Sequence, residues 1–213
     1  RGKVKSVEPA LGAAFVDYGA SKDGFLPFDE VSGRSLTRFT GHGRAQGSGR
    51  AGVRIGDQVL VQVTKEAFGK KGATLTTYVS LPGRFVVLMP LSDRTGVSKK
   101  VVGEERARLK EIASQLVVPD GYGMIVRTSG ESERIQEIQA DLDQLIATWR
   151  EIEAGFITRT SPGEIYEDHG LAVRFVRDYM TSDVTEILVE DEPSARELAV
   201  YIEGRMPHRM SLL

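Results

Sequence analysis

Hydrophobic and polar residues alternate along the first eighty positions in short runs, as they do in β-strands. Three such runs, at residues 2–7, 13–18 and 24–28, are separated by clusters of turn-forming residues. Alternation resumes over residues 58–64, and residues 73–79 are rich in threonine and other β-favouring side chains. Five short strands with one long insertion are typical of an OB-type β-barrel, so we predict a five-stranded barrel here.

The insertion, at about residues 33–54, is rich in glycine, and four arginines are spaced among the glycines of residues 32–52: Arg34, Arg38, Arg44 and Arg50. We find no periodicity in it, which predicts a flexible Arg/Gly loop. Its arginines either provide diffuse affinity for RNA or only keep the insertion soluble.

Beyond residue 80 the spacing of hydrophobic residues changes, and helix-like and strand-like segments alternate. The expected strands are residues 84–89, 122–128 and 185–189, and the expected helices are residues 103–116, 131–153, 171–180 and 194–202. The longest helix has one apolar stripe, formed by Ile135, Ile138, Leu142, Leu145, Ile146, Trp149 and Ile152. We therefore predict an α+β multidomain protein in which the barrel is followed by a mixed α+β region.

The amino-acid composition and the absence of certain motifs exclude several classes of function. The chain has no cysteine, which excludes disulfides and thiolate metal sites and suits a reducing cytoplasm. Its longest apolar run, residues 85–89, is too short to cross a bilayer. No Walker-type phosphate loop, zinc-protease motif or usable Ser/His/Asp set occurs, so we expect no catalytic residue and no metal site in this chain. The carboxylate pairs Asp141/Asp143 and Asp183/Glu186 are expected to lie on solvated faces or at helix caps.

The charge distribution points to a polyanion near the N-terminus. The net charge is −2, but residues 1–78 hold twelve Lys/Arg against seven Asp/Glu, a net of +5, and the remainder has a net of −7. Within the basic half, Phe15 shares a strand face with Asp17, and Phe25 lies in a similar strand. Both rings are either core residues or half-exposed platforms that stack on unpaired bases.

Two further sets of polar residues have a functional and a structural interpretation. Lys70 and Lys71 occupy a turn between strands, where they are either solvated or contact RNA phosphates. Arg127 and Thr128 end a strand that runs into a helix. Such residues form a phosphate pocket, or else Arg127 makes an ion pair and Thr128 caps the helix. On the residues alone, the structural interpretation of Arg127 and Thr128 is favoured.

A series of short motifs runs along most of the chain. They are AAFVDYG at 13–19, GFLP at 24–27, KGATLTT at 71–77, LMP at 88–90, GMIVRT at 123–128, RxxRDY at 174–179 and EILV at 186–189. In their order and spacing the chain resembles the ribonuclease E/G family, except in the insertion. The resemblance implies an OB-fold domain for single-stranded RNA at residues 1–77, a 5′-monophosphate sensor region at 78–172, and part of an RNase-H-like region at 173–213.

The resemblance also implies roles for individual residues. Phe15, Phe25 and Lys71, with the neighbouring Lys70, would form the surface for single-stranded RNA. Gly83, Val87, Arg127 and Thr128 would form the pocket for a 5′-monophosphate, which now favours the functional interpretation of Arg127 and Thr128.

The same resemblance implies what this chain lacks. The catalytic magnesium and structural zinc of the family would be held by later residues, so no cofactor is expected here and the chain is expected to be a piece of a longer, homo-oligomeric endoribonuclease. Two alternatives are a stand-alone, non-catalytic RNA-binding adaptor and a scaffold that binds no RNA.

Overall fold

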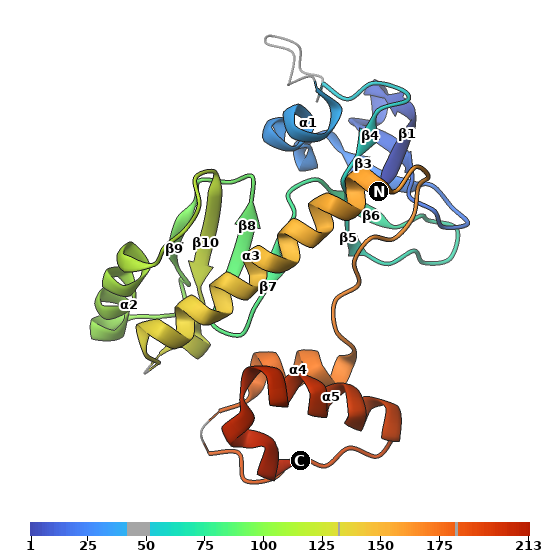
Figure 1. Cartoon of the computed structure of the whole chain (residues 1–213). Coiled ribbons are helices and arrows are strands. Elements are labelled where there is room, and N and C mark those ends of the chain that lie inside the picture. Colours follow the sequence, from blue (N-terminus) through green and yellow to red (C-terminus); the bar gives the residue numbers. More distant parts are fainter. Residues whose placement is uncertain (42–51, 132, 182) are drawn as a thin grey trace.

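The computed structural model describes residues 1–41, 52–131, 133–181 and 183–213. Three units follow one another along the chain: a β-barrel, a four-stranded sheet with two helices, and a C-terminal helical unit (Figure 1). Most of the buried apolar side chains form three clusters, one in each unit. Among the described residues, no helix is both long and apolar enough to span a membrane.

The barrel consists of strands β1 (Gly2–Glu8), β2 (Ala13–Asp17), β3 (Gly24–Pro27), β4 (Gln58–Val59), β5 (Gln62–Lys65) and β6 (Thr74–Thr76), in the order β4-β1-β2-β3-β6-β5. Strands β4 and β5 belong to one chain segment, which pairs with β1 at its start and with β6 at its end. This segment therefore closes the sheet. It corresponds to the fourth of the five predicted strands, divided at Leu60 and Val61, and the OB-type class is confirmed.

The predicted loop over residues 33–54 is wrong in its first part, which forms helix α1 (Gly33–Thr40). The Ser32 side chain caps the helix by accepting the Ser35 N–H, and Gly41 ends it with a left-handed φ of 76°. Leu36 is buried in the barrel core, which supplies the stabilisation that a two-turn helix lacks in isolation. The rest of the predicted loop, with Arg44 and Arg50, includes residues 42–51, which lie outside the described residues.

The second unit contains strands β7 (Leu81–Pro82), β8 (Val86–Pro90), β9 (Thr95–Val97) and β10 (Tyr122–Val126), in the order β7-β8-β10-β9. Helix α2 (Gly103–Gln115) follows β9, and helix α3 (Ile135–Thr158) crosses one face of the sheet (Figure 1). The predicted stripe of α3 packs against Val86, Leu88, Met124 and Val126, so its core-facing role is confirmed.

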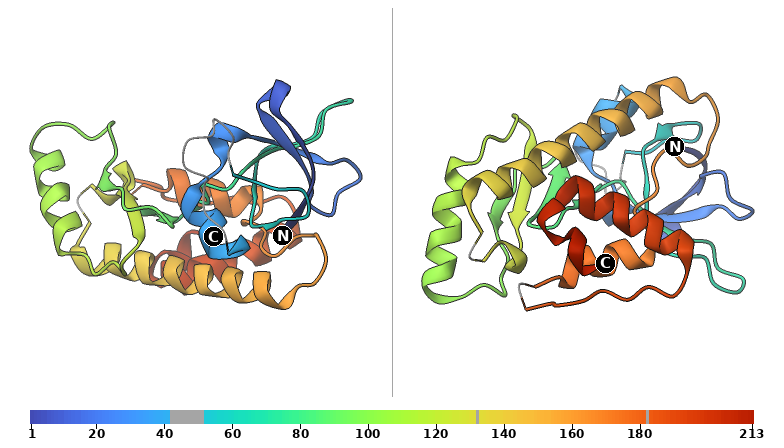
Figure 2. Two further views of the ribbon diagram at one scale, coloured as in Figure 1. Left: turned by 90° about the horizontal axis from the view of Figure 1, so that it is seen from above. Right: turned by 60° about the horizontal axis from the view of Figure 1, so that its bottom comes forward.

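Helix α3 also joins the sheet to the barrel. Phe39 of α1 packs against Trp149 and Phe156, with ring centroids 6.3 and 4.6 Å apart. Beside these rings, Arg38 forms an ion pair with Glu153 at 3.0 Å. The two units therefore share an apolar contact along the second half of α3 (Figure 2).

The C-terminal unit contains helices α4 (Leu171–Tyr179) and α5 (Glu192–Arg205) and the 3-10 turn η4 (Pro207–Leu212). Three shorter 3-10 turns occur earlier, at η1 (Pro9–Leu11), η2 (Phe28–Glu30) and η3 (Thr128–Gly130). The predicted strand at residues 185–189 is wrong, because in the described part of the chain it has no strand to pair with. A β-branched run becomes a strand only where a neighbour completes the ladder. Here the Ile187 N–H donates instead to the Leu212 carbonyl.

Candidate nucleic-acid interface

The outer face of the barrel carries an aromatic pair. Phe15 on β2 and Phe25 on β3 are direct cross-strand partners, and their rings meet edge to face with centroids 5.9 Å apart. Their neighbours Ala14, Val16 and Leu26 point into the barrel and are fully buried. Since side chains alternate along a strand, Phe15 and Phe25 face outward, and both are half-buried. This placement leaves parts of both rings accessible to an unpaired base.

Lys70 and Lys71 are exposed in the hairpin between β5 and β6. The hairpin is held against β3, because the Phe25 N–H donates to the Ala73 carbonyl at 2.7 Å. Gly72 allows this close approach, since a Cβ there would lie 2.1 Å from the Asp23 carbonyl oxygen. The barrel thus carries outward aromatic rings on β2 and β3 and exposed lysines on a hairpin joined to β3. Aromatic rings combined with cations are typical of surfaces that bind unpaired bases and their phosphates.

The second predicted set also comes together in space. Arg127, directly after β10, donates from its backbone N–H to the Phe85 carbonyl at 2.7 Å and from Nη1 to the Gly83 carbonyl at 2.6 Å. Val87 lies on β8 between Pro82 of β7 and Ile125 of β10. Thr128, exposed, begins the turn η3. The four residues therefore surround the β7–β8 turn and the end of β10.

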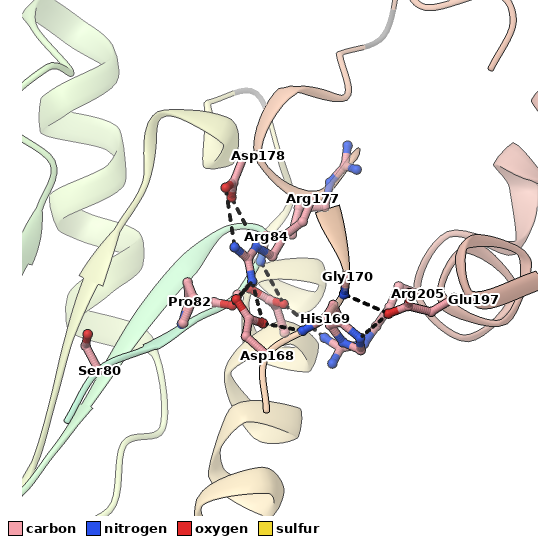
Figure 3. Close-up of polar contacts among 12 residues, drawn as sticks. Ser80, Pro82, Arg84, Asp168, His169, Gly170, Arg177, Asp178, Glu197 and Arg205 are labelled. Atoms are coloured by element: carbon pink, nitrogen blue, oxygen red, sulfur yellow. Dashed lines mark hydrogen bonds and ion pairs between the residues drawn. The ribbon is translucent and has the colours of Figure 1, made fainter. Parts of the chain in front are cut away.

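Arg127 has a partner that the sequence did not reveal. Its Nη1 lies 2.7 Å from Oδ1 of Asp178 on α4. Asp178 also accepts from Arg177, whose nearly buried guanidinium is held by both oxygens of Asp168 at 3.0 Å (Figure 3). Burial alone would raise the pKa of Asp178, but hydrogen bonds from Arg177 and Arg127 bring it below its usual value. Asp178 is therefore ionised at neutral pH and orients Arg127.

The prediction that Asp141 lies on a solvated face or at a helix cap is wrong. Its side chain is buried, and it accepts the backbone N–H groups of Arg84, Phe85 and Val86 at 3.2, 2.8 and 3.1 Å. Arg205 of α5 completes the set at 3.3 Å. Consecutive N–H groups of this kind form an anion-binding concavity, and here the chain's own carboxylate fills it. The spacing of Asp141, three residues after Ile138 and four before Leu145, already placed it on the apolar stripe.

The Asp141 contact explains why residue 83 is a glycine. A Cβ at Gly83 would lie 2.4 Å from Oδ2 of Asp141 and 2.8 Å from Cδ1 of Leu145. Gly83 contacts Arg127 through its backbone, with its carbonyl oxygen accepting from Nη1.

A Gly83→Ala substitution should lower the free energy of unfolding by about 1–3 kcal/mol, because the helix and the turn must separate to admit the methyl group. Chemical denaturation followed through the buried Trp149 measures this. Gly96→Ala, where an added Cβ meets no atom within 4 Å, is the matched control. Equal midpoints for the two variants would contradict the steric argument.

The first two arginines of the insertion are engaged in ion pairs. Arg34 pairs with Asp93 and Arg38 with Glu153, along the wall of a groove of about 550 Å³ that Tyr122 also lines. These pairs tie α1 to the second unit.

Within the described residues, no cluster of three or more His, Asp or Glu side chains could hold a metal ion.

A closed barrel with an outward aromatic pair and an adjacent lysine turn defines an RNA-binding protein, and the S1 RNA binding domain model matches residues 1–77. The model of the ribonuclease E/G family matches residues 80–213. The chain belongs to the ribonuclease E/G family.

Individual relatives agree with this assignment. Ribonuclease E of Escherichia coli is 40% identical over 201 residues, which cover 93% of this chain and 19% of the relative. Ribonuclease E of Haemophilus influenzae is 44% identical over 204 residues, covering 93% of this chain and 21% of the relative. Ribonuclease G of E. coli is 32% identical over 221 residues, covering the whole chain and 44% of the relative. The chain thus spans about a fifth of the two ribonuclease E relatives.

Proposed function

We propose that this chain binds single-stranded RNA and recognises its 5′ end as part of an endoribonuclease. That enzyme is proposed to act in RNA processing, including rRNA processing, and in mRNA decay. The observation that carries the proposal is the presence, in one chain, of the barrel surface of Phe15, Phe25, Lys70 and Lys71 and of an oriented arginine beside the exposed Thr128. The proposed setting is the cytoplasm, which suits a chain without cysteine.

In this proposal the barrel binds RNA without regard to sequence. The aromatic pair stacks on unpaired bases, because every base has a π-face, and the lysines contact phosphates. A duplex hides those faces, so paired RNA is bound only through its charge. The surface therefore selects single-stranded substrate.

The pocket at Gly83, Val87, Arg127 and Thr128 is proposed to take the 5′-monophosphate. Arg127 uses Nη1 for the Gly83 carbonyl and for Asp178. A guanidinium has further N–H donors, and these are proposed to bind the phosphate. The Thr128 hydroxyl adds a donor next to it. Since none of the described residues forms the metal site, the proposal assigns cleavage to a magnesium-dependent part of the longer, homo-oligomeric enzyme.

Arg127→Gln should abolish the preference for a 5′-monophosphate. A charged hydrogen bond contributes about 1.5–3 kcal/mol, so the unaltered chain should bind a 5′-monophosphorylated oligonucleotide roughly tenfold or more tighter than its 5′-hydroxyl form. The variant should bind both forms with the affinity of the hydroxyl form. Fluorescence anisotropy with labelled single-stranded RNA measures the four constants.

Arg174→Gln, which removes an exposed arginine from α4, is the matched control and should keep the preference. Equal binding of both 5′ ends by the unaltered chain would refute end sensing by these residues, while leaving RNA binding by the barrel intact.

A further inference from the structure

Phe68 is the most exposed large hydrophobic side chain among the described residues, with 87% of its surface accessible. It lies in the hairpin between β5 and β6 and belongs to none of the three apolar clusters. The fold therefore does not account for an aromatic residue at this position. An exposed aromatic ring surrounded by cations is instead typical of surfaces that bind unpaired nucleic acid.

The hairpin holds Phe68 and Lys71 opposite each other. The Phe68 N–H donates to the Lys71 carbonyl at 3.1 Å, and the Lys71 N–H donates to the Phe68 carbonyl at 3.0 Å. Gly69, with a φ of 57°, takes the first position of the two-residue turn, where a left-handed residue is required. Directly opposed residues of a hairpin project on the same side. The Phe68 ring and the Lys71 ammonium group thus share one face.

The hairpin is joined to the part of the barrel that carries Phe25. Thr74, which pairs with Phe25, is three residues from Lys71, at most roughly 10 Å along an extended chain. Lys22, from the turn before β3, donates to the Gly69 carbonyl and ties the hairpin tip to the start of β3. Lys22, Lys70 and Lys71 surround the tip, and the nearby carboxylates are Asp23 and Glu66. The local charge favours a polyanion.

We propose that Phe68 is a third stacking platform, which binds an unpaired RNA base next to those held by Phe15 and Phe25. Lys71 contacts the phosphate that links these nucleotides. The inference rests on the proposed RNA binding by the barrel and extends it. In this arrangement the RNA runs from the aromatic pair on β2 and β3 to the tip of the β5–β6 hairpin. The contact is specific for single strands, since the base must be free to lie on the ring.

Substitution tests the affinity. Phe68→Ala should weaken binding of a single-stranded oligonucleotide roughly 5- to 100-fold, and Phe68→Tyr should retain it. Phe68→Leu keeps an apolar side chain without a π-face and should behave like the alanine variant. Phe175→Ala removes a similarly exposed phenylalanine from α4 and should have no effect. Unchanged thermal midpoints are expected for all Phe68 variants, since the ring is not in the core.

A Phe68→Trp variant tests the contact itself. The chain's one natural tryptophan, Trp149, is fully buried, so a change in emission reports the new residue. Single-stranded RNA should quench this emission, whereas inorganic polyphosphate, which offers charge without bases, should bind and leave it unchanged. RNA that binds without quenching, together with an unaffected Phe68→Ala variant, would overturn the inference. Failure of the unaltered chain to bind RNA at low salt would instead overturn the proposed function of the barrel.

Discussion

Replacing both Phe15 and Phe25 with alanine should lower the affinity of the chain for single-stranded RNA by about 30-fold or more. Each base–aromatic stack contributes roughly 1–3 kcal/mol, and both rings lie on the outer face of the barrel. Because the rings contact each other, we expect the two single variants to be non-additive. Anisotropy titrations of the single and double variants, at several salt concentrations, measure this coupling.

The salt dependence separates stacking from phosphate contact. The phenylalanine variants should lose affinity by a similar factor at every salt concentration, since they remove no charge. Lys71→Ala should instead reduce the slope of log affinity against log salt by about one contact, and Lys70→Ala by about one more if it too reaches a phosphate. A double phenylalanine variant with unaltered affinity would show that another surface binds RNA.

Replacing Asp141 with alanine should lower the free energy of unfolding by about 3 kcal/mol. The substitution leaves three backbone N–H groups, of Arg84, Phe85 and Val86, without their acceptor and removes the partner of Arg205. Denaturation followed by Trp149 emission monitors the same unit. Asp143→Ala, two residues along the same helix on its exposed face, is the control and should change stability by less than about 0.5 kcal/mol.

The Asp141 variant should also impair the proposed binding site for the 5′-monophosphate. The turn that Asp141 holds contains the Gly83 and Phe85 carbonyls, and these position the Arg127 side chain and backbone. A folded Asp141→Ala protein should therefore discriminate less between 5′-monophosphate and 5′-hydroxyl RNA, while its affinity for the hydroxyl form stays the same. Full stability together with full discrimination would show that the carboxylate is dispensable.

The elements of this chain were predictable where a local pattern repeats over enough residues. The stripe of α3 recurs through about five turns, so the helix and its buried face follow from the hydrophobic period alone. The alternation around Phe15 placed its ring on the same strand face as Asp17 but left open whether that face is buried. By contrast, the apolar face of α1 consists only of Leu36 and Phe39, and the glycines and arginines around them gave no helical pattern. The helix forms because Leu36 packs in the barrel core and Phe39 packs on α3.

The sequence by itself determined the strands of the barrel, the long helix and the family resemblance, because these depend on residues close together in the chain. Only the tertiary structure decided that Phe15 and Phe25 face outward. It also decided the partners of isolated charges. Arg127 finds Asp178 fifty-one residues later, and Asp141 fills a backbone concavity more than fifty residues earlier. Among the described residues, 185–189 find no neighbouring strand, so this run forms no ladder. Long-range pairing depends on how the units pack, which no local period encodes.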